Sequence, residues 1–216
     1  MSLNEILSRI QDELAKKDAA RQEVQTAMRK CTRLSKTAIF HMHKEKFEEA
    51  KAKLAEAKEL LDNLHNMTAD FSGLVYMGSV DSAFEEYAEA QIFFTLIKEG
   101  RFISHEEINV PIAPYVLGLA DVIGELRRQT LDYLRRNRIK KALQNLELME
   151  TIYAELVNLD EANILVHELR RKCDVARHVL EATRGDVTIE VRRSQLENSI
   201  KDLRKRLEAK RKNGPI

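Results

Sequence analysis

The sequence predicts an all-α fold, and three observations carry that prediction. Glycine and proline are scarce, at 7 and 3 in 216 residues, so few positions interrupt a helix. The strong helix formers Ala, Leu, Glu, Lys and Arg are abundant. Hydrophobic residues make up 44% of the chain and recur three or four positions apart, which is enough to build a core between amphipathic helices. We therefore expect one helical domain over residues 1–216.

Two long helices are expected at the beginning of the chain. Hydrophobic residues at helical spacing predict a first helix over residues 3–43 and a second over about 46–66. Gly73 and Gly78 then predict a loop over residues 67–79, because glycine is common where helices are connected.

The next elements have recognisable end signals. A mostly apolar helix is expected over residues 80–100, with Gly100 as its C-capping glycine. Ser104 and Glu107 have the spacing of a capping box and predict a short helical turn.

The segment 112–126 predicts a buried helix, since it is apolar on nearly all sides. Pro111 and Pro114 suit its first turn, and an amphipathic continuation extends it to about Arg136.

Three further helices are expected in the last third of the chain. Two cover about 139–158 and 161–183, and a charged final helix carries heptad-like apolar positions from 196 to 207. We place the boundary before that last helix at residues 184–186. The alternative, a short strand at 186–191, is disfavoured because a single strand has no partner.

Charge and composition exclude several classes of protein. The formal net charge is +1, so overall charge indicates neither binding nor avoidance of nucleic acid. Cys31 and Cys173 are far apart and form no Cys-x-x-Cys motif, which is typical of reduced thiols in a cytoplasmic protein. No apolar stretch reaches transmembrane length and no signal-peptide core begins the chain, so we expect no membrane association.

Two acidic residues stand out in the apolar segment 112–126. Asp121 and Glu125 are its only charged residues and, four positions apart, they share one helix face. Burying an unpaired carboxylate costs several kcal/mol or more, so these groups require a cation, a base or a shared proton.

A second acidic pair, Glu86 and Glu89, lies on one face of the preceding apolar helix. If the two helices pack together, four carboxylates meet, and all-oxygen ligation suits a hard divalent cation such as Mg²⁺ or Mn²⁺. The alternative is that Glu86 and Glu89 are solvated, or pair with Arg and Lys of other helices.

Other catalytic motifs are absent from the sequence. No histidine follows a glutamate by three positions, which excludes the Glu-x-x-His pattern of di-iron bundles, and only Asp62 with His65 comes close. The chain has no glycine-rich phosphate loop, no dinucleotide fingerprint and no serine or cysteine nucleophile motif.

Several clusters of basic residues are candidates for phosphate binding. Arg127 and Arg128 directly follow the Asp121–Glu125 pair and are the best of them. Carboxylates that hold metal beside arginines that hold phosphate form a phosphodiester-cleaving arrangement. The ordinary alternative is a solvated helix surface balanced by glutamate.

These segments resemble the translin family, most closely its translin-associated factor X branch. FEEYAEAQIFFTLIKEGRFISHEEIN carries the Glu-Tyr-x-Glu-Ala pattern of that branch, and PYVLGLADVIGELRR carries its later Asp-x-x-Gly-Glu-Leu-x-Arg pattern. LSKTAIF, residues 34–40, resembles the early-helix pattern of the family.

The resemblance implies a bundle of about seven helices and a Mg²⁺- or Mn²⁺-dependent endoribonuclease that works inside a closed octameric shell. Its four acids match Glu86, Glu89, Asp121 and Glu125. The long basic N-terminal extension and loop insertion of larger relatives are missing, which implies a single-component homo-oligomer. Two other hypotheses stay open: a non-catalytic assembly that binds RNA or single-stranded DNA, and a structural protein whose acids pair internally.

Overall fold

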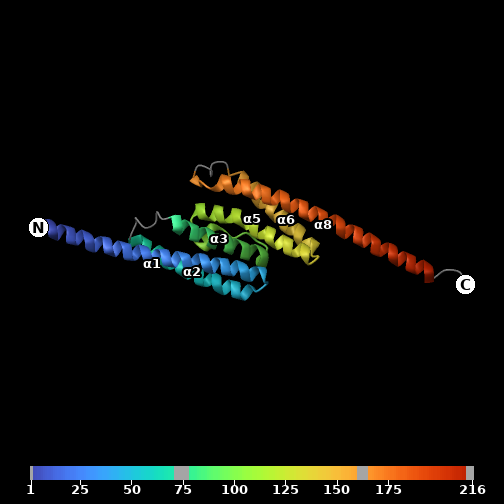
Figure 1. Ribbon diagram of the computed structural model, residues 1–216, viewed down its shortest axis with the longest axis horizontal. Coiled ribbons are helices and arrows are strands. Elements are labelled where there is room, and N and C mark those ends of the chain that lie inside the picture. Colours follow the sequence, from blue (N-terminus) through green and yellow to red (C-terminus); the bar gives the residue numbers. More distant parts are fainter. Residues whose placement is uncertain (1, 71–77, 160–164, 213–216) are drawn as a thin grey trace. The chain divides into compact units, whose positions relative to one another are not determined.

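The computed structural model describes residues 2–70, 78–159 and 165–212. Within these ranges the chain forms seven helices and no strand, which confirms the predicted all-α class (Figure 1). The chain divides into two compact units, and the long helix α5 (Ile112–Arg135) runs from one into the other. The first unit comprises residues 1–122 and 160–170, and the second comprises 123–159 and 171–216. The prediction that residues 1–216 form one domain stays a prediction.

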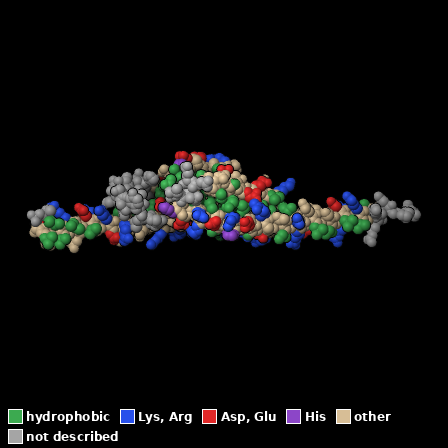
Figure 2. All heavy atoms as spheres, turned by 90° about the horizontal axis from the view of Figure 1, so that it is seen from above, with side chains coloured by type: hydrophobic (Ala, Val, Ile, Leu, Met, Phe, Trp, Pro, Cys, Tyr) green, Lys and Arg blue, Asp and Glu red, His purple; other side chains and the backbone are tan. Residues whose placement is uncertain are grey.

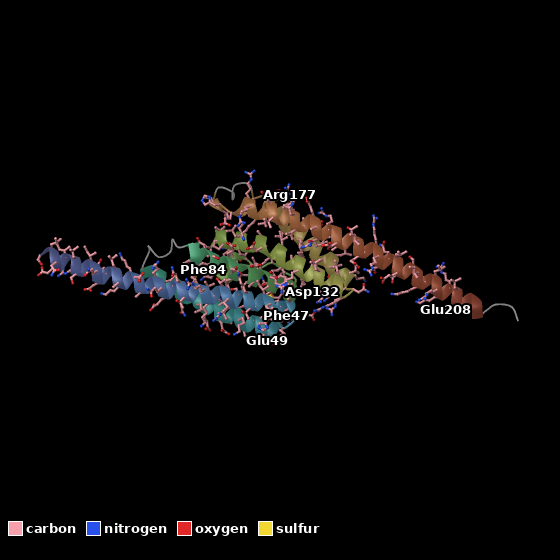
Figure 3. The ribbon with its side chains drawn as sticks, in the orientation of Figure 1. Phe47, Glu49, Phe84, Asp132, Arg177 and Glu208 are labelled. Atoms are coloured by element: carbon pink, nitrogen blue, oxygen red, sulfur yellow. The ribbon has the colours of Figure 1, made fainter. Side chains whose placement is uncertain are left out.

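The first unit is built on α1 (Leu3–His43), which packs against α2 (Phe47–Asp70) and α3 (Gly78–Glu99). Buried side chains of these helices form its core, among them Met28, Cys31, Leu54, Tyr87, Ile92 and Phe93. Phe47, at the start of α2, makes an edge contact with Phe94 of α3 at 6.5 Å, and the Lys98 ammonium lies over the Phe47 ring (Figure 3).

The predicted helix over residues 3–43 is confirmed, but the predicted loop over 67–79 is wrong at both ends. Helix α2 continues to Asp70 and α3 already begins at Gly78, while residues 71–77 lie outside the described part of the chain. The reason is that 67–70 contains no residue that breaks a helix, and a glycine in the first turn costs little.

Two local end signals are confirmed. Gly100 has φ +70° and its N–H donates to the carbonyls of Thr95 and Leu96, as expected of a C-capping glycine. Ser104 and Glu107 form a capping box at α4 (His105–Ile108). The Tyr115 hydroxyl then donates to the carbonyl of Ile103 at 2.6 Å, which ties the start of α5 to this turn.

The second unit contains the remainder of α5, α6 (Ile139–Val157) and nearly all of α8 (Leu169–Lys212). A buried amide pair joins α5 to α6, where Asn145 donates to the Gln129 oxygen at 2.9 Å. Arg184 of α8 forms an ion pair with Glu150 of α6.

The predicted boundary at residues 184–186 is wrong, because α8 passes through it without a break. A glycine inside an exposed helix costs only about 1 kcal/mol. Side-chain contacts on both sides of Gly185 oppose that cost: Arg184 pairs with Glu150, and Asp186 pairs with Arg127. Residues 186–191, the alternative strand, are therefore helical. The predicted start of the preceding helix at 161 falls in 160–164, outside the described residues. The prediction is wrong at 166–168, which form a bend and a turn before α8 begins at Leu169.

The Cys31 and Cys173 thiols are both free, and burial raises the pKa of Cys31 to about 12. None of the described helices is sufficiently long and apolar to span a bilayer.

Candidate acidic site on helices α3 and α5

The four predicted acids occupy two helices, and all are half-buried. Glu86 and Glu89 lie on α3, and Asp121 and Glu125 lie on α5. The expectation that α5 is buried on nearly all sides is wrong in part. Val116, Ala120, Val122, Ile123 and Leu126 are buried, but Ile112 is 64% exposed and Gly124 is exposed. The acid-bearing face of α5 therefore retains contact with solvent, which lowers the cost of holding charge there.

Gly118 brings the backbone of α5 directly against that of α3. A Cβ atom at this position would lie 2.7 Å from the carbonyl oxygen of Glu85 and 2.8 Å from the backbone nitrogen of Glu89. Only glycine permits this approach. Asp121 follows Gly118 by three residues on the same side of the helix, about 4.5 Å further along its axis. The glycine contact thus places Asp121 beside the segment of α3 that carries Glu86 and Glu89.

Lys36 of α1 provides a cation at the same place. Its ammonium lies 2.9 Å from the Glu86 carboxylate, whose side chain is 22% exposed. The hydrogen bond to Glu86 and the charge of Glu86 raise the pKa of Lys36, with a smaller contribution from Glu89. Both acids of α3 therefore act electrostatically on one positive charge.

Glu125 lies one turn beyond Asp121 on the same face of α5, where the second unit has begun. The Arg128 guanidinium is 3.8 Å from its carboxylate, and the Glu125 side chain is 22% exposed.

The donor chemistry fits a hard divalent cation, since all four predicted ligands are carboxylates and the Lys36 ammonium already lies against one of them, Glu86. In the described residues, however, no three His, Cys, Asp or Glu side chains stand close enough together to hold a metal ion. Glu86, Glu89, Asp121 and Glu125 could hold one only if their side chains turned toward a common point.

The two predicted phosphate-binding arginines differ in their surroundings. Arg127 donates to the Thr183 hydroxyl at 2.8 Å and pairs with Asp186 at 3.2 Å, so it fastens α5 to α8 within the second unit. Arg128 is more exposed and keeps part of its guanidinium available. Of the two, Arg128 is better placed to meet a ligand.

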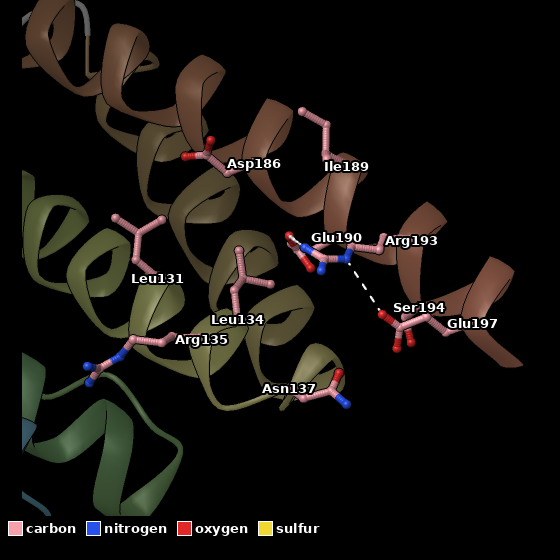
Figure 4. A pocket seen from close by; sticks show the side chains of 10 residues that line it. All are labelled: Leu131, Leu134, Arg135, Asn137, Asp186, Ile189, Glu190, Arg193, Ser194 and Glu197. Carbon is pink, nitrogen blue, oxygen red and sulfur yellow. Dashed lines mark ion pairs between the residues drawn. The ribbon is translucent and has the colours of Figure 1, made fainter.

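The second unit also contains a hollow of about 560 Å³ (Figure 4). Leu131 and Leu134 of α5 line it together with Asp186, Ile189 and Glu190 of α8. Its lining combines apolar leucine and isoleucine side chains with ion-paired charged residues. These residues do not form an arrangement known from catalytic sites.

Lys36 is the member of the site that the sequence did not single out. The signal was present, because it lies in the early-helix segment LSKTAIF. Helical periodicity could not show that Glu86, fifty positions later, lies against Lys36.

The comparisons with known proteins agree with one another. The model of the translin family matches residues 19–182. An uncharacterized protein of Methanocaldococcus jannaschii is 33% identical over 190 residues, which cover 87% of this chain and 84% of that protein.

Solved structures with similar folds carry the name C3PO. The complex of AfC3PO with duplex RNA aligns with TM-score 0.77 at 32% identity, over 85% of this chain and 95% of that chain. Apo-NeC3PO aligns with TM-score 0.78, over 88% of this chain and 98% of that chain. Its identity of 24% limits that likeness to the fold.

Proposed function

The chain belongs to the translin family, and from that premise we propose that it is a metal-dependent endoribonuclease acting on single-stranded or structured RNA. The observation that carries the proposal is the set of four half-buried carboxylates on α3 and α5, positioned by the backbone contact at Gly118. The sequence patterns around these acids resemble the catalytic, translin-associated factor X branch. Cleavage of labelled RNA with and without EDTA tests the proposal directly.

Each acid has a role in this proposal. Glu86, Glu89 and Asp121 would hold Mg²⁺ or Mn²⁺, and Glu125 would complete the ligand set or accept a proton from the attacking water. The bound ion supplies Lewis-acid stabilisation of charge on the scissile phosphate. Lys36 forms an ion pair with Glu86, and with an ion on Glu86 its ammonium would be free to contact a phosphate oxygen. Arg128 orients the phosphate, while Arg127 holds α5 against α8.

RNA as the ligand is supported by a relative. AfC3PO, at 32% identity, has been solved in complex with duplex RNA. Because the net charge of this chain is only +1, RNA binding needs a local concentration of basic groups, which assembly of several copies provides.

A non-catalytic RNA- or single-stranded-DNA-binding assembly is the second candidate. The ion pair between Lys36 and Glu86 favours it, since a lysine that permanently neutralises the acid would take the place of a metal. Cleavage assays separate the two candidates, because both predict binding and only one predicts a cut strand.

Divalent metal is expected to stabilise the wild-type protein. A cation that binds the folded chain and not the unfolded chain stabilises the folded state by mass action. At 100 times its Kd, Mg²⁺ or Mn²⁺ adds about 2.7 kcal/mol to the free energy of unfolding, which raises Tm by roughly 5–10 °C. Thermal unfolding with metal, compared with EDTA, measures the shift.

Two alanine variants control that measurement. Glu89→Ala should lose most of the metal-dependent shift, whereas Glu49→Ala, an exposed acid of α2, should retain it (Figure 3). An equal shift in wild type and Glu89→Ala would place the bound metal elsewhere.

We also expect a homo-oligomer, with eight subunits as the family resemblance implies. Large apolar side chains are exposed at both ends of the chain: Leu3, Leu7, Ile10 and Leu14 of α1, and Leu196, Ile200, Leu203 and Leu207 of α8 (Figure 2). Such stripes suit contacts between subunits. Light scattering coupled to size exclusion should give a mass near eight times 24.9 kDa.

A charge within the α8 stripe should reduce that mass. Leu203→Glu introduces a carboxylate among the exposed apolar residues, whereas Asn198→Glu adds the same charge on the opposite side of the helix. A wild-type monomer that still cleaves RNA would contradict the enclosed assembly.

A further inference from the structure

One face of α1 combines basic side chains with an exposed aromatic ring. Arg29, Arg33, Lys36 and Phe40 follow one another at i, i+4, i+7 and i+11, so they lie in a single row along the helix. All four are exposed, and Phe40 is 50% exposed. We call this row the basic face of α1.

The basic face contains a shallow surface pocket. Its four residues, with Thr32 and Thr37 beside them, line a shallow depression of about 410 Å³. The row from Arg29 to Phe40 extends for about 16 Å along the helix axis. That length corresponds to several nucleotides, since stacked nucleotides rise about 3.4 Å each along a strand.

Two of the three cations on this face are available for a ligand. Among the described residues, neither the Arg29 nor the Arg33 guanidinium forms an ion pair with a carboxylate. Lys36, the third cation of the row, reaches Glu86 at 2.9 Å. The basic face therefore passes beside Glu86 of the acidic site, and its cations match the repeating charge of a phosphate backbone.

Phe40 adds a contact of a different kind. An exposed aromatic ring beside cations is the arrangement on which unpaired bases stack, because every base offers a π-face. The Lys44 ammonium lies 5.6 Å from the centre of the Phe40 ring and adds positive charge at that end of the face.

We propose that the basic face of α1 binds the backbone of a single RNA strand, with Phe40 stacking on one of its bases, and leads the strand to Glu86 and Glu89. This inference rests on the proposed function, because it supplies the strand to that same site. It assigns binding to Arg29, Arg33, Lys36 and Phe40 in addition to Arg128.

Binding of a fluorescein-labelled oligouridylate, followed by anisotropy in EDTA, tests the proposal without cleavage. Arg29→Gln combined with Arg33→Gln should weaken binding by about tenfold or more at low salt. The slope of log affinity against log salt should fall by about 1.4, since each lost phosphate contact on a single strand contributes about 0.7. The matched control, Lys51→Gln with Lys58→Gln on exposed positions of α2, should bind as wild type does.

The stacking contact is tested with a second pair of variants. Phe40→Leu should weaken binding of the single strand by about tenfold, in the range for one stacked base, and should leave the salt slope unchanged. Phe102→Leu changes a phenylalanine of similar exposure, 45%, and should have no effect.

Wild-type affinity in both the double arginine variant and Phe40→Leu would overturn the proposal. So would a loss of binding accompanied by a changed mass in light scattering, because the face would then be a contact between subunits. If wild type binds RNA through this face but cleaves nothing with metal present, the inference stands and the proposed enzyme fails. If wild type cleaves RNA and the variants bind and cleave equally well, only the inference fails.

Discussion

Replacing Asp121 by asparagine is expected to lower the rate of RNA cleavage by about 10²–10⁴-fold while RNA binding persists or becomes stronger. The change keeps the size and hydrogen-bonding capacity of the side chain and removes its charge. Asp121 is half-buried next to Gly118, where α5 meets α3, so losing this charge removes a metal ligand from the centre of the proposed site. RNA affinity is not reduced, because the variant has one negative charge fewer to repel the phosphates.

The helix itself provides the control for this variant. Asp132→Asn makes the same substitution further along α5, where the carboxylate pairs with Arg135 at 3.0 Å on the surface (Figure 3). It should cleave as wild type does. Glu125→Gln should behave as Asp121→Asn does. Unchanged cleavage by both Asp121→Asn and Glu125→Gln would leave the non-catalytic binding assembly as the better explanation.

The second large effect is expected at Gly118. Replacing it by alanine puts a Cβ atom 2.7 Å from one backbone atom of α3 and 2.8 Å from another, and backbone atoms cannot rotate aside. Overpacking of this kind costs about 1–3 kcal/mol. That exceeds the gain of about 1 kcal/mol that alanine normally brings to a helix interior. Separating α3 from α5 also moves Asp121 relative to Glu89, and a displacement of about 1 Å can reduce catalysis about 10²-fold.

Gly124→Ala is the matched control, because a Cβ atom at that position meets nothing within 4 Å. It should stabilise the protein by up to about 1 kcal/mol. Urea denaturation of the two variants should therefore shift the midpoint in opposite directions. If Gly118→Ala is as stable as Gly124→Ala and cleaves RNA equally well, the close contact between α3 and α5 does not position the site.

Local signals made much of the fold predictable. The helix over residues 3–43, the C-capping glycine at 100 and the capping box from Ser104 to Glu107 depend on residues near one another in sequence, and all three are confirmed. The break at 184–186 was wrong because a local signal, Gly185, is outweighed by contacts with Glu150 and Arg127. Those partners lie far away in sequence, where periodicity carries no information.

For the site, too, local spacing was predictable from the sequence and contacts between distant segments were not. Spacing placed Glu86 with Glu89, and Asp121 with Glu125, on common helix faces, and the structure keeps each pair on its helix. It could not show that Lys36 pairs with Glu86, or that Gly118 is the residue that meets α3. Nor could apolar composition show that the acidic face of α5 stays half-exposed, because exposure depends on which helices cover it.

If the acids of α3 and α5 cut RNA with the help of a divalent cation, cleavage must depend reversibly on that cation. Purified wild-type protein is incubated with end-labelled single-stranded RNA in Mg²⁺ or Mn²⁺, then in EDTA, and then in EDTA followed by excess Mn²⁺. We expect internal cleavage with metal, none in EDTA and recovery of cleavage when Mn²⁺ is restored. Cleavage that persists in EDTA, or RNA that stays intact with every cation while the assembled protein binds it, would contradict the claim.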